Sequence, residues 1–198
     1  MGKIFYLMGK SSSGKDTIFK ELMKGSGKLG TIVPYTTRPI RVGEQEGVEY
    51  HFTDEAGFQQ LSDAGKVIEQ REYHTIYGLW RYFTVDDGQF VSGGDTDYVM
   101  IGTLEAYRSM QAYFGRENVL PVLIELDDGV RLQRALEREM QQEKPGYEEL
   151  CRRFLADSAD FAEEKIREAG IEKRFYNDNL EHCLNEIQAY INEQKMPI

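Results

Sequence analysis

The sequence of 198 residues contains few of the residues that bind metals or form covalent crosslinks. It has two cysteines, Cys151 and Cys183, and three scattered histidines. Two cysteines cannot build a disulfide framework and are typical of a reducing compartment, so we expect a cytoplasmic location. The histidines and cysteines lack the spacing of zinc ligands, which argues against zinc chemistry.

Long apolar runs and an excess of positive charge are also missing. No window approaches the roughly 20 apolar residues of a membrane-spanning helix, and the first apolar run, residues 4–8, is too short for a secretory signal. With 24 Lys and Arg against 34 Asp and Glu, the net charge is −10. We therefore expect neither a membrane nor a nucleic acid as a partner.

The negative charge is unevenly distributed along the chain. Residues 1–50 hold eight Lys and Arg against five Asp and Glu, a local net charge of +3. The length suits a single domain, and the 40% of apolar residues suffice for a sizeable core. A basic segment in an otherwise acidic protein can collect a small polyanion.

Short apolar runs alternate with helical patterns through most of the chain. This alternation predicts an α/β fold with a mainly parallel sheet and helices on both faces. Residues 34–94 lack long periodic runs, so we expect an irregular inserted lobe there and a core built from 1–33 and 95–198. Strands are predicted at 4–8, 98–101, 120–126 and 173–176, and helices at 15–24, 54–64, 104–114, 129–140, 147–169 and 180–194.

A glycine-rich loop follows the first predicted strand. Residues 9–15 read G-K-S-S-S-G-K and satisfy G-x-x-x-x-G-K. Such a loop curls its N–H groups around phosphate oxygens, with a helix N-terminus and a lysine aimed at the same anion. A plain Gly/Ser turn is the alternative, but the position between strand and helix favours a phosphate site. The candidate phosphate ligands are Gly9, Ser11, Ser12, Ser13, Gly14 and Lys15.

The residue after the lysine departs from the usual hydroxyl of this motif. Asp16 occupies that position, and Thr17 follows it. Because a carboxylate is a hard oxygen ligand, we hypothesise that Asp16 binds Mg²⁺, with Thr17 also at the ATP site. The alternative is that Asp16 only favours the start of the helix.

A second basic motif lies at residues 35–52, which read YTTRPIRVGEQEGVEYHF. Arg38 and Arg41 stand close to the hydroxyl group of Tyr50. Planar guanidinium groups with hydroxyls nearby are suited to clamp a second phosphate. On these residues alone, a solvated basic loop is the simpler interpretation.

The pattern T-T-R-x-x-R-x-G-E-x-x-G-x-x-Y-x-F, about twenty residues after the glycine loop, resembles the guanylate kinase family. The resemblance implies a P-loop kinase core of three layers, an acceptor-binding lobe at 34–94 and an arginine-bearing lid at about 127–154. It also implies transfer of the ATP γ-phosphoryl group to GMP, with Mg²⁺ as cofactor.

The same resemblance assigns individual residues. Glu69 would face the guanine, Glu44 would brace the arginines, and Asn177 would lie on the adenine side. Packed core aromatics and solvated carboxylates are the plainer alternatives for these residue types. The GMP ligands implied are Arg38, Arg41, Glu44, Tyr50, Glu69, Tyr77 and Thr103.

Three positions differ from the family. Pro34 and Leu79 stand where the family carries serine, and Thr103 where it carries aspartate. Guanine selectivity would then depend largely on Glu69. The G-K-D version of the loop also resembles ribose 1,5-bisphosphate kinases, so another phosphorylated acceptor stays open. A non-catalytic binding domain of the same family is the third alternative.

Arginines recur in the predicted lid. Arg131, Arg134 and Arg138 are spaced i, i+3 and i+7 along one side of a helix, and Arg152 and Arg153 follow. A solvated helix face is the ordinary interpretation, whereas the resemblance implies closure over the ATP phosphates. The spacing favours Arg134, Arg138 and Arg153 as catalytic residues beside Lys15 and Arg41.

Overall fold

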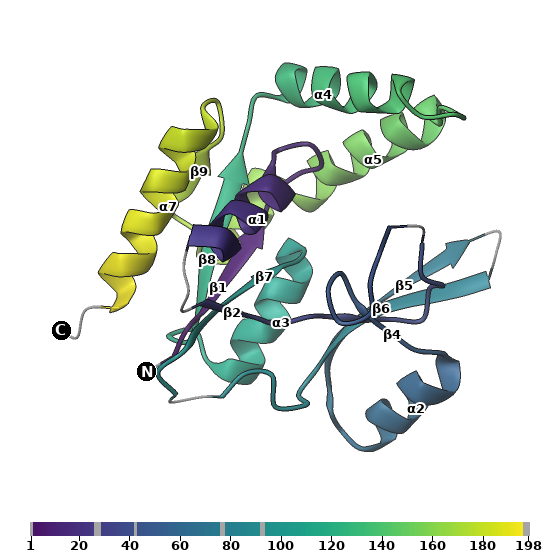
Figure 1. The fold of residues 1–198 in the computed structure, drawn as a ribbon, viewed down its shortest axis with the longest axis vertical. Helices are drawn as coiled ribbons and strands as arrows, with labels where there is room; N and C mark the ends of the chain where they lie inside the picture. The colour runs from purple at the N-terminus through teal and green to yellow at the C-terminus, as the bar shows by residue number, and fades with distance from the viewer. Residues whose placement is uncertain (1, 26–28, 42, 76–77, 92–93, 196–198) are drawn as a thin grey trace.

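The computed structural model describes residues 2–25, 29–41, 43–75, 78–91 and 94–195. Within these ranges the strands form two sheets, one in a core and one in a lobe that projects from it (Figure 1). Two long helices lie together above the core in the same view. No helix among these residues is both long and apolar enough to cross a membrane.

The core sheet has the strand order β2-β7-β1-β8-β9, and every neighbouring pair is parallel. This confirms the α/β fold with a mainly parallel sheet. The central strand is wholly buried, as expected for an apolar run covered on both faces. The strands are β1 (Ile4–Met8), β2 (Leu29–Thr31), β7 (Asp97–Ile101), β8 (Val119–Glu125) and β9 (Arg174–Tyr176).

Helices cover both faces of this sheet. Alternate residues of β1 point to opposite sides, so Tyr6 and Met8 pack in one apolar cluster while Phe5 and Leu7 pack in another. The first cluster includes residues of α3 and α6, and the second includes residues of α1 and α7. The bounds are α1 (Lys15–Gly25), α3 (Leu104–Phe114), α6 (Glu163–Glu168) and α7 (Leu180–Lys195).

The lobe is more regular than the sequence predicts. Its sheet has the order β4-β3-β6-β5 and includes a long antiparallel hairpin. The expectation of an irregular lobe is therefore wrong. Residues of the hairpin strand β5 are mostly half-buried or exposed on both faces, so no apolar alternation marks it. The elements are β3 (Tyr35–Thr36), β4 (His51–Phe52), α2 (Glu55–Asp63), β5 (Val67–Thr75) and β6 (Gly78–Val85).

The two helices above the core are α4 (Asp128–Met140) and α5 (Tyr147–Asp160), and they contact each other. The prediction of one helix over 147–169 is wrong, because α5 ends at Asp160 and α6 begins at Glu163. The break lets Phe161 turn into the apolar cluster that also buries Ile166. Burial of Phe161, which follows α5, together with Ile166 of α6 thus outweighs helix continuity.

Candidate active site

The loop of residues 9–15 joins β1 to α1 in a tightly curled conformation. Gly14 has a φ of +91°, and a Cβ at this position would overlap the side-chain amide of Asn177. Ser12 has a φ of +63°, the left-handed region that non-glycine residues seldom adopt. The glycine at position 14 is therefore required both by its backbone angle and by the close approach of Asn177.

Two hydroxyl groups in this loop are buried without a partner. Among the side-chain polar atoms of the described residues, only Ser12 Oγ and Ser13 Oγ are buried and make no hydrogen bond. A buried polar group without a partner costs free energy, and native structures contain few. Both hydroxyls can donate to an anion held in the loop.

Three side chains from distant segments hold the loop in place. Asn177 Nδ2 donates to the Ser13 carbonyl (2.7 Å), and Arg131 Nη1 donates to the Ser11 carbonyl (2.8 Å). The Ser11 N–H in turn donates to Asp157 Oδ2 (2.7 Å). Asn177, expected on the adenine side of ATP, has its amide buried beneath the loop. Arg131 and Asp157 were not predicted for this position.

The first turn of α1 faces the lobe. Lys15 opens the helix, and no described carboxylate forms an ion pair with it. Asp16 and Thr17 are exposed beside it. Asp16 lines a cavity of about 360 Å³ whose opposite wall includes Pro34 and Tyr50 of the lobe. The start of α1 and the second basic motif therefore border one space.

In the lobe, Arg38 is 2% exposed and forms two hydrogen bonds to Glu44, of 2.9 and 2.8 Å. Its Nε donates to the Tyr82 hydroxyl (3.1 Å), which sequence analysis did not single out. The Arg38 guanidinium also lies over the Tyr50 ring, 5.4 Å from its centroid. These hydrogen bonds hold the pKa of Glu44 below its usual value.

Arg41 differs from Arg38 in its exposure. Its backbone N–H donates to Glu44 Oε2 (2.8 Å), so one carboxylate contacts both arginines of the motif, while the Arg41 side chain is exposed. Arg41 is thus the arginine with its donors in solvent. Tyr77, the remaining phosphate candidate of the lobe, lies outside the described residues.

The base-contact candidates lie where lobe and core meet. Glu69 on β5 is buried and accepts from the Thr84 hydroxyl (2.7 Å). Thr103 precedes α3, and its hydroxyl accepts from the Ala106 N–H as the helix N-cap. Thr103 also lines a cavity of about 560 Å³ with Arg71 of β5. Arg71, which sequence analysis did not select, forms an ion pair with Glu69.

The arginines of α4 and α5 fall into two groups. Arg131 is buried against the loop, while Arg134 and Arg138 are exposed. Arg134 Nη1 lies 3.9 Å from the position that a Cβ would occupy at Gly14, so it is close to the loop. Arg153 is paired with Glu149 at 3.7 Å.

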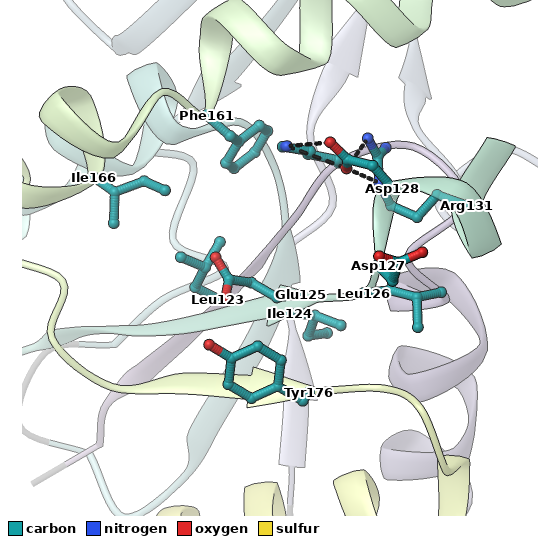
Figure 2. A pocket seen from close by; sticks show the side chains of 11 residues that line it. Leu123, Ile124, Glu125, Leu126, Asp127, Asp128, Arg131, Phe161, Ile166 and Tyr176 are labelled. Atoms are coloured by element: carbon teal, nitrogen blue, oxygen red, sulfur yellow. Dashed lines mark hydrogen bonds and ion pairs between the residues drawn. The ribbon is translucent and has the colours of Figure 1, made fainter.

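Cavities open at the carboxyl end of β8, the edge at which α/β sheets bind ligands. One of about 230 Å³ has Asp128 and Arg131 at one end and Tyr176 at the other (Figure 2). A second, of about 430 Å³, lies between Arg134 and Asp178. The first is lined by Lys10 of the 9–15 loop, which pairs with Asp128 (3.3 Å), and the second by Arg134, which lies close to Gly14 of the same loop.

No cluster of three or more His, Cys, Asp or Glu side chains suitable for a metal ion exists in the part of the chain that the structure describes. Asp16 is an isolated exposed carboxylate on the cavity wall. That arrangement fits Mg²⁺, which usually keeps several waters and takes one or two carboxylates plus substrate phosphates.

The parallel core, the curled glycine loop and the inserted lobe together form a P-loop kinase fold. The structure superimposes on guanylate kinase from Anaplasma phagocytophilum with a TM-score of 0.63 and 20% identity, covering 99% of this chain and 88% of that one. At this identity the likeness concerns the fold.

Sequence comparison finds similarity to guanylate kinases. Residues 1–81 match the family model "Guanylate kinase". The chain is 29% identical to guanylate kinase of Paraburkholderia xenovorans, covering 96% of this chain and 79% of the relative. It is 28% identical to guanylate kinase of Methylobacillus flagellatus, covering 98% and 91%. The chain is thus similar to guanylate kinases over nearly its whole length.

Proposed function

We propose that this protein is an ATP-dependent guanylate kinase, which transfers the γ-phosphoryl group of ATP to GMP and gives ADP and GDP. One observation carries the proposal: Asp16, beside the glycine loop, and Tyr50, beside Arg38, line the same cavity. A donor phosphate in the loop and an acceptor phosphate at the arginines would therefore meet. In this division, residues 34–94 bind the acceptor and about 127–154 act as the lid.

The ATP phosphates bind in the loop. The partnerless hydroxyls of Ser12 and Ser13 and the free ammonium group of Lys15 provide donors, and the start of α1 adds its positive dipole end. Asn177 contributes by holding the Ser13 carbonyl. The adenine occupies the cavity between Arg134 and Asp178. The full set of ATP-binding residues is Gly9, Ser11, Ser12, Ser13, Gly14, Lys15, Asp16, Thr17 and Asn177.

Asp16 would hold Mg²⁺, an ion that usually takes one or two carboxylates together with substrate phosphates and water. When bound, the ion neutralises charge on the transferring phosphoryl group. Asp16 belongs to the first turn of α1 and lines the same cavity as Tyr50, which supports its carboxylate as the metal ligand between donor and acceptor.

The acceptor phosphate binds Arg41 and Arg38, with the hydroxyls of Tyr50 and Tyr77. Most N–H groups of the Arg38 guanidinium donate to protein partners, so Arg38 acts mainly as a fixed positive charge. The guanidinium of Arg41 remains available to the ligand. Glu44 stays ionised and braces both arginines. Glu69 reads the guanine, whose N1–H and 2-amino group are donors that a carboxylate can accept. Thr103 lies beside the base.

The reaction needs no general base, because an acceptor phosphate is already a nucleophile. Catalysis comes from holding the two phosphates in line and from positive charge around the transferring group. Arg134, Arg138 and Arg153 supply this charge when the lid closes, together with Lys15 and Arg41. Closure also excludes water, which would otherwise accept the phosphoryl group.

An assay of ADP release across a panel of acceptors tests the proposal. The panel contains GMP, dGMP, AMP, UMP, CMP and ribose 1,5-bisphosphate, each with ATP and Mg²⁺. We expect the highest kcat/KM with GMP. Strong turnover of ribose 1,5-bisphosphate or of another nucleotide, with none on GMP, would contradict it. Failure to bind ATP and Mg²⁺ in a titration would instead indicate a non-catalytic domain.

A further inference from the structure

The guanine-reading carboxylate does not stand alone in the structure. Arg71 lies two residues after Glu69 on β5, so both side chains project from the same face of the strand. Arg71 Nε donates to Glu69 Oε2 at 3.2 Å, and Nη2 approaches Oε1 at 3.5 Å. Thr84, opposite Glu69 on β6, donates to Oε1 at 2.7 Å. The three residues form one polar cluster at the border between lobe and core.

This ion pair is largely removed from water. The side chains of Glu69 and Arg71 are 4% and 18% exposed. A buried ion pair often stabilises a fold no better than an apolar pair of the same volume, so its presence here calls for a role other than stability. The exposed part of Arg71 lines the 560 Å³ cavity together with Thr103.

Arg71 has donors to spare. Its contacts with Glu69 occupy two of the five N–H groups of a guanidinium, and no other described residue accepts from it. Glu69 likewise keeps free acceptor positions. Thr84 and the shorter Arg71 bond take one position on each oxygen, and a carboxylate offers about four in all. The pair therefore presents free acceptor positions on both carboxylate oxygens of Glu69 and, next to them, free N–H donors of Arg71.

Guanine carries the complementary order along one edge: the 2-amino group and N1–H donate, and O6 accepts. Adenine carries an amino donor in place of O6 and a bare N1, so both Arg71 and Glu69 would meet a group of the wrong kind. Pro34 and Leu79 offer no side-chain donor for O6.

We propose that Arg71 is a specificity-determining residue that donates to guanine O6 beside Glu69. The inference rests on the proposed function, since it names the group that recognises the base in the same site. Glu69 and Arg71 thus recognise different groups of guanine. Glu69 accepts from N1–H and the 2-amino group, and Arg71 donates to O6. The charge of Arg71 also influences Tyr50, so binding of the acceptor phosphate is the rival role that a test must separate.

The test is Arg71→Met, assayed for kcat/KM with GMP, IMP and AMP. IMP keeps O6 and N1–H but lacks the 2-amino group. We expect kcat/KM to fall about 10- to 100-fold for GMP and for IMP, which is the effect of losing a charged hydrogen bond. The two factors should agree within about twofold. The kcat/KM for AMP should be unchanged or higher, so the ratio of kcat/KM between GMP and AMP falls sharply.

Three results would overturn the proposal. An equal loss for GMP, IMP and AMP would mean that Arg71 binds the acceptor phosphate. A larger loss for GMP than for IMP would mean that Arg71 only positions Glu69, because GMP has one more donor to that carboxylate. Unchanged discrimination with retained activity would remove Arg71 from recognition altogether.

Glu69→Gln is the matched comparison variant. It should lower kcat/KM for GMP more than kcat/KM for IMP. Thermal unfolding checks that each variant folds. If Arg71→Met does not fold, Arg71→Lys takes its place, because it keeps the charge but loses the planar fork, and the same ratios decide. If the unmodified protein does not phosphorylate GMP, the proposed function fails. If the unmodified protein phosphorylates GMP but the Arg71 variant keeps the same ratios of kcat/KM between GMP, IMP and AMP, only this inference fails.

Discussion

Arg131 and Arg134 lie one turn apart on α4, yet the structure assigns them opposite roles. Arg131 is 1% exposed and donates to the Ser11 carbonyl, whereas Arg134 is exposed beside the loop. We predict that Arg131→Met destabilises the fold and that Arg134→Met leaves stability unchanged but slows phosphoryl transfer.

The size of the Arg131 effect follows from its contacts. Removing the guanidinium leaves the Ser11 carbonyl without this donor, at about 1–3 kcal/mol. Its interaction with the Phe154 ring, 4.8 Å away, contributes about 0.5–1 kcal/mol. The ion pair with Asp128 adds little, because that carboxylate is 52% exposed and water replaces the arginine. The total is about 2–4 kcal/mol.

Thermal unfolding and the ADP-release assay together test this pair. For a chain of this length about 1 kcal/mol shifts Tm by roughly 2–4 °C, so Arg131→Met should lower Tm by about 4–16 °C. Arg134→Met should stay within about 2 °C, since exposed substitutions change stability by about 0.5 kcal/mol or less. An unchanged Tm for Arg131→Met, or an equal drop for both variants, would refute the reasoning.

Three further predictions concern the two anion sites. Lys15→Ala should lower kcat about 100-fold or more with an unchanged Tm, and the exposed Lys24→Ala is its control; near-normal activity of Lys15→Ala would contradict the assigned role. Asp16→Ser should raise the Mg²⁺ concentration needed for half-maximal rate, and an identical Mg²⁺ titration would remove Asp16 from the metal site. Glu44→Gln should destabilise the fold by about 1.5–3 kcal/mol near neutral pH. Hydrogen bonding to Arg38 lowers the pKa of Glu44 in the folded state. The loss of unfolding free energy in Glu44→Gln should therefore be complete above the ordinary pKa of 4.5 and disappear as pH falls through the lowered pKa. Urea unfolding across pH 3 to 7 measures this loss, and a loss that does not change with pH would contradict the ion pair.

The core could be predicted from sequence because its strands are continuous apolar runs. Residues 4–8 have no polar interruption, and residues 120–126 have one, Glu125, close to the end of the run. The segments that follow these runs show the apolar period of a helix. The hairpin of the lobe gives no such signal. Glu69, Arg71 and Glu72 place charged groups along β5, and Thr84 and Arg81, which bond Glu69 and Glu72, lie across the strand pair on β6 rather than nearby in sequence. Pairing of that kind is a tertiary property.

The arginine pattern of α4 shows a similar limit. The spacing of Arg131, Arg134 and Arg138 identifies a charged line on one helix but does not say which member faces the protein. Ala135, four residues after Arg131, shows which side of α4 faces the protein, because Ala135 and Arg131 are both buried on that side. A charged residue that shares a helical face with small apolar residues is therefore a candidate for a buried bond to another segment.

The 9–15 loop shows how fold and function compete at one place. Ser12 adopts a left-handed backbone, and the hydroxyls of Ser12 and Ser13 are buried without partners, each at a cost to stability. Asn177, Arg131 and Asp157 offset that cost by bonding the loop from three other segments. All three bind the loop through its backbone, which leaves both serine hydroxyls unengaged. A loop whose backbone is restrained while its serine hydroxyls stay free is organised for an anion before the anion arrives, so little further ordering entropy is lost on binding.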